Sequence, residues 1–252
     1  MWSDEDLRWL RSAFFPLYLK GQFVEGWIPF KALYDGKQVV INPSTADIAK
    51  LAVKGEYIED HYKVRIRWQV GYDKYPFTEE IGGRVDALSA RLGKRLADLH
   101  VYEDPPNFLC DSGPRDLNRA FTDAFNLEKY LLQFLIPRLY AQSYYEKYEK
   151  WPWGELSHHF LGLFEWFARA ANITREDLVG TARDIVKLTG EKMLFYLVSK
   201  KYGGNHRCVC PSGDKLKDCH SDVMKGIRRM RETEKRYGLT LPQLIIEART
   251  CS

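Results

Sequence analysis

The stretch HRCVCPSGDKLKDCH, residues 206 to 220, constrains the fold of this chain more than any other. It contains three of the five cysteines and two of the six histidines in the 252-residue sequence. Cysteines this closely spaced form a disulfide knot, hold a metal ion or remain free thiols. For a knot or a metal site the segment must turn back sharply, and Ser212-Gly213 supplies residues suited to that turn.

The N-terminal sequence helps to choose among these alternatives. Residues 1 to 21, MWSDEDLRWLRSAFFPLYLKG, begin with acidic side chains, and charges and Pro16 interrupt their apolar run. They match neither a signal peptide nor an anchor, and no other stretch reaches the roughly 18 apolar residues of a membrane span. We therefore expect a cytoplasmic protein, in which disulfides are rare and a metal site is the better interpretation.

The candidate ligand set is Cys208, Cys210, Cys219 and His220. Three thiolates and one imidazole are the donors that zinc prefers in a tetrahedral site. Four protein ligands leave no open coordination position, so we expect a structural zinc ion. Cys251, near the C-terminus, is not part of this set.

The same stretch resembles the SEC-C motif, a short zinc hairpin. The pattern of that motif is Cys-x-Cys, a Ser-Gly turn, a basic stretch and a final Cys-His, and the basic residues here are Lys215 and Lys217. The resemblance covers only these fifteen residues. It implies an accessory module that contacts other proteins, and it does not identify the activity of the chain.

The order of expected elements before the hairpin indicates an α+β fold. Ser3 and Asp6 have the spacing of a capping box ahead of an amphipathic helix. Asp35-Gly36 marks the turn between two strands. Residues 61–70 alternate apolar and basic side chains, which is typical of a strand with one buried face.

The next segments are expected to be less regular. Pro76 predicts an extended turn, and Gly82-Gly83 a tight turn before another short strand. Residues 98–116 contain three prolines and have no sustained period, so they predict a long loop with Cys110 in its middle.

From residue 117 onward the pattern is mostly helical, with a kink or break predicted at Pro137. Thr174 and Asp177 are expected to begin a further helix. Large aromatic side chains are expected in the core, namely Trp151, Trp153, Trp166 and the tyrosines around Tyr144. A later basic helix is interpreted as a solvated face that carries Arg228, Arg229 and Arg231.

Cys110 is the second chemical feature of the sequence. A lone cysteine in such a loop is either a small, partly buried apolar residue or a thiolate nucleophile that forms a covalent intermediate. The surrounding elements bear on that choice, because they resemble a known family.

The order of the elements resembles that of the ubiquitin-conjugating-enzyme family, and in particular its bacterial members in antiviral operons such as those of CBASS systems. The matching stretches are YIEDHYKVRIRW, YPFTEEIGGRV, DLHVYEDPPNFLC and LIPRLYAQSYYEKYEKWPWGELSHHFLG. The resemblance spans roughly residues 20 to 170. It implies a ubiquitin-conjugating-enzyme-like antiparallel sheet with flanking helices. We divide the chain into a conjugating-like domain at 1–170, a helical extension at 171–205, the zinc hairpin at 206–220 and C-terminal helices at 221–252.

The resemblance also implies a chemistry. In that family the loop cysteine receives the C-terminal carboxyl group of a protein modifier as a thioester from an activating enzyme, and a lysine amine then attacks it. This role falls on Cys110. His100 lies at the family's histidine position, but His-Pro-Asn is here His100-Val101-Tyr102, so the oxyanion donor stays open between Asn107 and a backbone amide near the cysteine.

His158, in the stretch WGELSHHF, is the other candidate. Near Cys110 it could lower the pKa of the thiol or accept a proton from the attacking amine. The structural alternative is that Ser157 caps a helix and His158 packs against the tryptophans.

Three functions remain open at this point. The first is a conjugating-like transferase in bacterial anti-phage defence, with an activating enzyme and a modifier with a free C-terminus as partners. In CBASS-type relatives that modifier can be a cyclic-nucleotide synthase. The second is an adaptor without chemistry, which the absent His-Pro-Asn suits, and the third is a cysteine deconjugase or hydrolase that uses Cys110 and His158. A net charge of +4 is too small for a nucleic-acid footprint.

Overall fold

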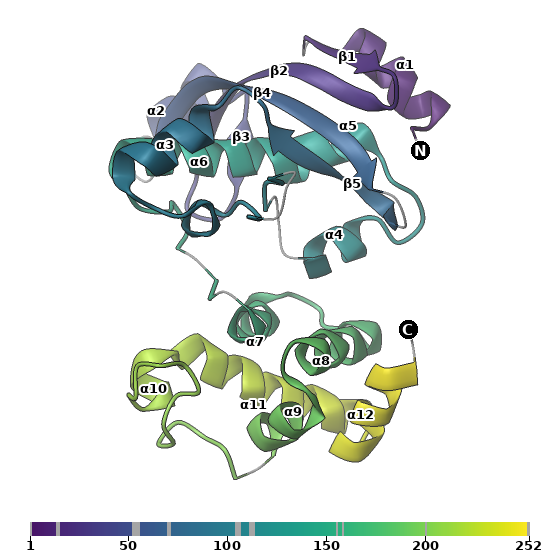
Figure 1. Ribbon diagram of the computed structural model, residues 1–252, viewed down its shortest axis with the longest axis vertical. Helices are drawn as coiled ribbons and strands as arrows, with labels where there is room; N and C mark the ends of the chain where they lie inside the picture. The colour runs from purple at the N-terminus through teal and green to yellow at the C-terminus, as the bar shows by residue number, and fades with distance from the viewer. Residues whose placement is uncertain are drawn as a thin grey trace. The chain divides into compact units, whose positions relative to one another are not determined.

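The computed structural model divides the chain into two compact units, Met1–Gly154 and Glu155–Ser252 (Figure 1). The structure describes residues 2–13, 16–51, 56–69, 72–103, 107–110, 114–154, 156–157, 159–199 and 201–250. The division lies ahead of helix α7 (Phe160–Arg169), and therefore earlier than the sequence-based boundary at residue 170, because α7 packs against helices that follow it. Among the described residues, no helix is both long and apolar enough to cross a bilayer.

The first unit is α+β and is built on a five-stranded antiparallel sheet. The strand order is β1-β2-β4-β5, and β3 pairs with β2. The strands are β1 Leu17–Lys20, β2 Phe23–Tyr34, β3 Val39–Ile41, β4 Tyr57–Gln69 and β5 Tyr72–Glu80. The predicted turn between β2 and β3 is confirmed, since the Asp35 carboxylate accepts the N–H groups of Lys37 and Gln38 and Gly36 has a φ of 93°.

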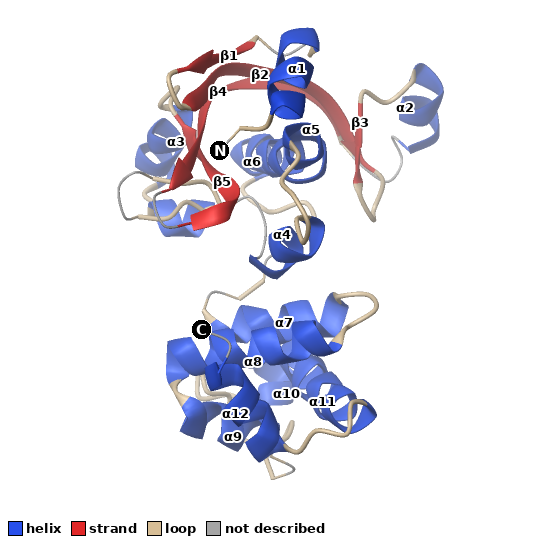
Figure 2. Ribbon diagram, turned by 90° about the vertical axis from the view of Figure 1, so that its right-hand side faces the viewer, coloured by secondary structure: helices blue, strands red, loops and turns tan. Residues whose placement is uncertain are grey.

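The alternation predicted for residues 61–70 is confirmed in β4. Tyr62, Val64 and Ile66 are buried, and the basic side chains between them lie on the other face. Val64 pairs with Gly26 and Ile66 with Val24 on β2, so the buried residues of both strands share one face. Figure 2 shows the sheet curving over helix α6, which packs against this face.

The helical elements of the first unit frame the sheet. They are α1 Asp4–Ser12, α2 Thr45–Leu51, α3 Arg84–Leu92, the 3-10 turn η1 Leu96–Leu99, α4 Pro114–Ala120, α5 Leu127–Tyr130, the π-helical turn η2 Leu131–Leu135 and α6 Ile136–Tyr148. The predicted capping box of α1 is confirmed, with Ser3 and Asp6 each accepting a backbone N–H of the other.

Two predictions for residues 75–85 are wrong. Pro76 lies inside β5 and makes no turn, because β5 is the last strand of the sheet and its register with β4 is irregular between Arg67 and Gln69. The segment after Gly82-Gly83 is helix α3 and not a strand. The Glu80 carboxylate accepts the N–H groups of Gly82 and Val85, which satisfies donors at the start of that helix.

The break predicted at Pro137 is also absent from the described chain. Helix α5, turn η2 and helix α6 follow one another without a gap from Leu127 to Tyr148. Proline removes one backbone donor and crowds the preceding turn. The π-helical turn just before α6 takes up this distortion, and Pro137 then lies in the first turn of α6, where its missing N–H costs little.

The second unit is entirely helical where the structure describes it. Its helices are α7 Phe160–Arg169, α8 Arg175–Thr189, α9 Glu191–Val198, α10 Leu216–Cys219, α11 Ser221–Arg236 and α12 Leu241–Thr250. The predicted capping box of Thr174 and Asp177 begins α8. Helices α7 and α11 approach closely at Gly226, where an added Cβ atom would lie 1.9 Å from the Phe164 carbonyl oxygen.

The basic face of α11 is not simply solvated, which corrects the sequence interpretation for two of its three arginines. Arg228 is exposed. Arg229 donates to the carbonyls of Phe167 and Ala168 at the end of α7. Arg231 donates to four carbonyls between Leu197 and Tyr202, at the end of α9. These side chains satisfy carbonyl groups that have no partner within their own helices.

Candidate functional site

Cys208, Cys210, Cys219 and His220 lie close together in the second unit, and their donor atoms all lie within 4.8 Å of one another. The hairpin predicted for this stretch is present. Arg207 pairs with Lys215 in an antiparallel bridge, and Gly213 at the turn has a φ of 78°. The short helix α10 then carries Cys219 back to the first two cysteines.

The distances between the donor atoms fit a single small metal ion. The Nδ1 atom of His220 lies 3.3 Å from the Sγ of Cys208 and 3.0 Å from that of Cys219. The Sγ atoms of Cys210 and Cys219 are 3.4 Å apart. Ligands about 2.0 to 2.3 Å from a tetrahedral ion lie roughly 3.5 to 3.8 Å from one another. The three cysteines are free thiols and not disulfide partners, so these residues could hold a metal ion.

The environment of the two leading cysteines differs. Burial raises the pKa of the Cys208 thiol to about 11. A hydrogen bond with the Ser212 side chain is the main cause that lowers the pKa of Cys210 to about 6. A bound cation would supply the positive charge that the buried Cys208 needs in order to ionise.

The hairpin is part of the core of the second unit. Cys208 is buried, and Leu216 is fully buried in the same apolar cluster as Val223 and Ile227 of α11. The Leu216 N–H donates to the His206 carbonyl, which closes the hairpin beneath this cluster. The metal-binding stretch therefore supplies core residues as well as ligands.

Cys110 lies beside the last strand of the first unit. Phe108 forms an antiparallel bridge with Glu79 of β5, and Leu109 forms one with Val101. The Cys110 N–H donates to the His100 carbonyl at 2.8 Å, which places these two residues opposite each other. The Cys110 side chain is half-buried. Because its amide bonds to His100, Cys110 does not itself offer that amide to an oxyanion.

His100 is held on both its backbone and its ring. Its φ of 55° is left-handed, which is uncommon for a residue with a side chain. Its imidazole lies edge-on to the Trp151 ring, with centroids 4.7 Å apart. Trp151 in turn stacks on Tyr145 at 4.5 Å. The imidazole therefore forms part of an aromatic cluster.

The other candidates of the first unit and their neighbours are placed as follows. Asn107 is half-buried on the same segment as Cys110. His158 and Cys251 lie outside the described residues. Ser157 does not cap α7 as the structural alternative assumed; His159 precedes that helix, and the Ser157 N–H and Oγ donate to the buried Glu165 carboxylate. Of the tryptophans expected in the core, Trp166 is buried, Trp151 half-buried and Trp153 exposed.

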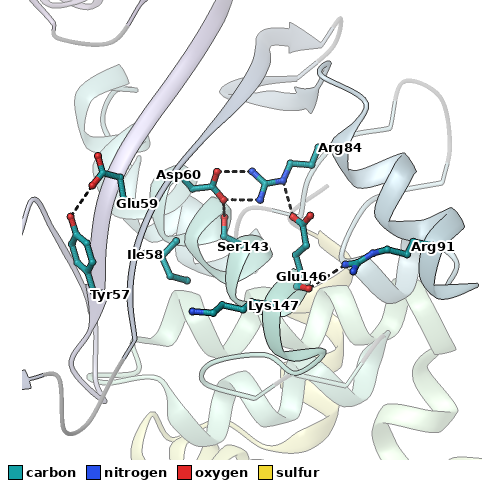
Figure 3. A pocket seen from close by; sticks show the side chains of 9 residues that line it. All are labelled: Tyr57, Ile58, Glu59, Asp60, Arg84, Arg91, Ser143, Glu146 and Lys147. Atoms are coloured by element: carbon teal, nitrogen blue, oxygen red, sulfur yellow. Dashed lines mark hydrogen bonds and ion pairs between the residues drawn. The ribbon is translucent and has the colours of Figure 1, made fainter.

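A polar pocket of about 420 Å³ on the first unit was not predicted (Figure 3). Its lining residues are Tyr57, Ile58, Glu59, Asp60, Arg84, Arg91, Ser143, Glu146 and Lys147. Arg84 binds the Asp60 carboxylate through two hydrogen bonds of 2.7 Å and also binds Glu146. Burial acts to raise the pKa of Asp60, but the hydrogen bonds from Arg84 and Ser143 outweigh it and lower that pKa overall. This network joins β4, α3 and α6.

Arg138 is a second residue that the sequence did not single out. It is buried on α6, and its Nη2 atom donates to the carbonyls of Leu99 and His100, next to Cys110 in space. Both of these targets are backbone atoms nearly forty residues away, so no side-chain motif marks the interaction.

No family model, no curated protein and no solved structure matches this chain. The functional argument is therefore built on the residues and their geometry.

Proposed function

We propose that this protein is a ubiquitin-conjugating-like transferase that carries a protein modifier as a thioester on Cys110 and passes it to an amine. The main support is the position of Cys110. Its half-buried thiol follows a segment paired to the edge of an antiparallel sheet, and its backbone is hydrogen-bonded to His100. The family resemblance implies this placement for a thioester cysteine and its upstream histidine.

The proposed reaction has two steps. First, the Cys110 thiolate attacks the thioester carbonyl of the modifier on the activating enzyme, and the thiol of that enzyme leaves. Second, an acceptor amine attacks the new thioester, the Cys110 thiolate leaves and the amine gives up a proton. Asn107 is our candidate donor to the oxyanion, since the Cys110 amide is used by His100. His158 is our candidate base.

We assign zinc to the Cys208, Cys210, Cys219 and His220 cluster, in a structural role. Three thiolates and one imidazole match its preferred donors, and the four residues would occupy every position of a tetrahedral ion. The hairpin is then a SEC-C-like module. The proposed partners are an activating enzyme and a modifier with a free C-terminus, for which a cyclic-nucleotide synthase of the CBASS type is a candidate. The proposed setting is anti-phage defence in the bacterial cytoplasm.

One observation favours a second function, that of a non-catalytic adaptor with a conjugating-enzyme fold. The His100 imidazole is packed against Trp151, as a structural residue would be. In the adaptor, Cys110 would be a half-buried structural thiol, and the hairpin would carry the binding role.

The deciding experiment is to purify the protein with its operon neighbours as wild type, Cys110→Ala and Cys110→Lys. Non-reducing gels and intact mass spectrometry would detect an adduct and give its mass. The transferase predicts a reducible adduct on the wild type, none on the alanine variant and a stable isopeptide on the lysine variant. No adduct on any form would favour the adaptor. Release of a free carboxylate from a conjugate, without an activating enzyme, would favour the deconjugase.

A further inference from the structure

Arg138 is a charged side chain buried directly beneath the cysteine loop. It is 5% exposed, and it projects from α6 toward the segment that follows η1. Its Nη2 atom donates to the Leu99 carbonyl at 2.7 Å and to the Gln142 Oε1 at 2.8 Å. A buried guanidinium is costly unless its donors are used in this way, so its interactions here are well defined.

The same atom reaches the backbone on which Cys110 depends. Arg138 Nη2 lies 3.3 Å from the His100 carbonyl oxygen, and that oxygen also accepts the Cys110 N–H at 2.8 Å. A single carbonyl therefore joins the cation to the backbone of the cysteine. The left-handed φ of His100, 55°, is a conformation that persists where the surroundings enforce it, and the contact with Arg138 does so.

The shape of the arginine side chain matters as well as its charge. Its guanidinium carbon lies 5.2 Å from the centre of the Trp151 ring, and Trp151 also contacts the His100 ring. A flat guanidinium can stack on the indole and bridge two carbonyls at once. A lysine ammonium keeps the charge but not this planar fork.

We infer that Arg138 is a positioning residue for the transfer reaction, which fixes the His100 carbonyl and thereby holds Cys110 where the incoming thioester is attacked. The inference rests on the proposed function. It predicts that Arg138 affects the maximal rate at which Cys110 is loaded and leaves the affinity for the loaded activating enzyme unchanged.

The test uses the full chain as wild type, Arg138→Lys and Arg138→Met. The control is Arg91→Lys, since Arg91 is an exposed arginine that donates to the Glu146 carbonyl. Hydrogen exchange of residues 107–110 is measured without partners, and single-turnover loading of Cys110 is measured against the concentration of activating enzyme. Thermal unfolding identifies any variant that fails to fold, and the lysine variant is the one expected to stay folded.

In Arg138→Lys we expect at least tenfold faster exchange at Cys110 and about a tenfold lower maximal loading rate, with an unchanged half-saturating concentration. Arg138→Met should lose more, and Arg91→Lys should match wild type. A folded Arg138→Lys within twofold of wild type in exchange and loading overturns the inference. If the wild type forms no thioester, the proposed function fails by itself, because the exchange measurement still tests the contact without partners.

Discussion

In the first unit the strands pair with one another along most of their length, whereas in the second unit side chains take over at the ends of the helices. Strands β2 and β4 form ten consecutive residue pairs from Val24 to Leu33. In the second unit Arg229 and Arg231 donate to carbonyls that end α7 and α9. A sheet spreads its backbone hydrogen bonds over many residues, while a capped bundle concentrates them on a few.

The core of each unit repeats this difference. The first core is made of apolar side chains from the sheet, α6 and the loop segments between them. The second includes Cys208 and Leu216 from the metal-binding hairpin. We therefore expect the second unit to be the more sensitive of the two to single substitutions and to loss of the metal.

Removal of the metal should have the largest effect. Zinc binding contributes on the order of 10 kcal/mol to small domains that fold around it, and the net stability of a domain is about 5 to 15 kcal/mol. The sequence alone predicts that chelation loosens only residues 204–225. Because Cys208 lies in the core, we expect loss of protection across α7 to α12 instead.

Hydrogen exchange of the full chain, followed by mass spectrometry, would measure this with and without a zinc chelator. The first unit is the internal control, and its protection should not change. Loss of protection confined to residues 204–225 would show that the hairpin is an appendage. Equal loss in both units would contradict the comparison itself.

The substitution Gly226→Ala should have the next largest effect. The new Cβ atom would lie 1.9 Å from the Phe164 carbonyl oxygen, which belongs to the backbone of α7 and cannot move aside alone. Forcing α7 and α11 apart should lower the free energy of unfolding of the second unit by about 3 kcal/mol. Chemical denaturation would measure the loss.

Gly203→Ala is the matched control for this change, because an added Cβ atom there meets no other atom within 4 Å. It should stay within about 0.5 kcal/mol of wild type, as most exposed substitutions do. Equal losses for both variants would mean that the close approach of the two helices is not the cause.

The substitution Arg231→Met should cost less, about 2 kcal/mol, because carbonyls at the end of α9 lose their donor while the apolar stem is largely kept. The control is Arg228→Met on the same helix, whose side chain is exposed and should contribute little. Urea unfolding of both variants would compare them. If the two losses are equal, the capping role of Arg231 is refuted.

The features that could be predicted from the sequence are those with a local cause. The capping boxes of α1 and α8, the Asp35-Gly36 turn and the alternation in β4 each depend on side chains within a few residues of one another. The Cys and His cluster was found for the same reason, since its four ligands lie within thirteen positions. Short-range chemistry therefore gave the strand pattern and the candidate metal site.

The features that could not be predicted depend on partners far away in the sequence. Pro76 fits within β5 only because that strand ends the sheet. Arg231 looks like any other surface arginine until α9 is placed beside it. Arg138 is the clearest case, since it binds backbone carbonyls that every sequence contains. Such roles need the tertiary structure.

The smallest expected effect tests the one place where the first unit also relies on charged side chains. Arg84 joins Asp60 of β4 to Glu146 of α6, and hydrogen bonds from Arg84 and Ser143 lower the pKa of Asp60 despite its burial. A carboxyl group with a lowered pKa in the folded state stabilises that state above the unfolded pKa, near 3.9. The stabilisation is lost as the pH falls through the folded pKa.

We therefore expect the free energy of unfolding of the first unit to fall below about pH 4, with Asp60 contributing about 1 kcal/mol of that change. In Asp60→Asn the fall should be shallower, because one carboxyl group no longer takes up a proton on folding's reversal. Asp86→Asn, on the exposed side of α3, should keep the wild-type slope. Urea unfolding between pH 3 and pH 7 would measure the slopes. If Asp60→Asn left the slope unchanged, the unit would owe its stability to strand pairing and apolar packing alone, and the contrast with the second unit would be sharper than we infer.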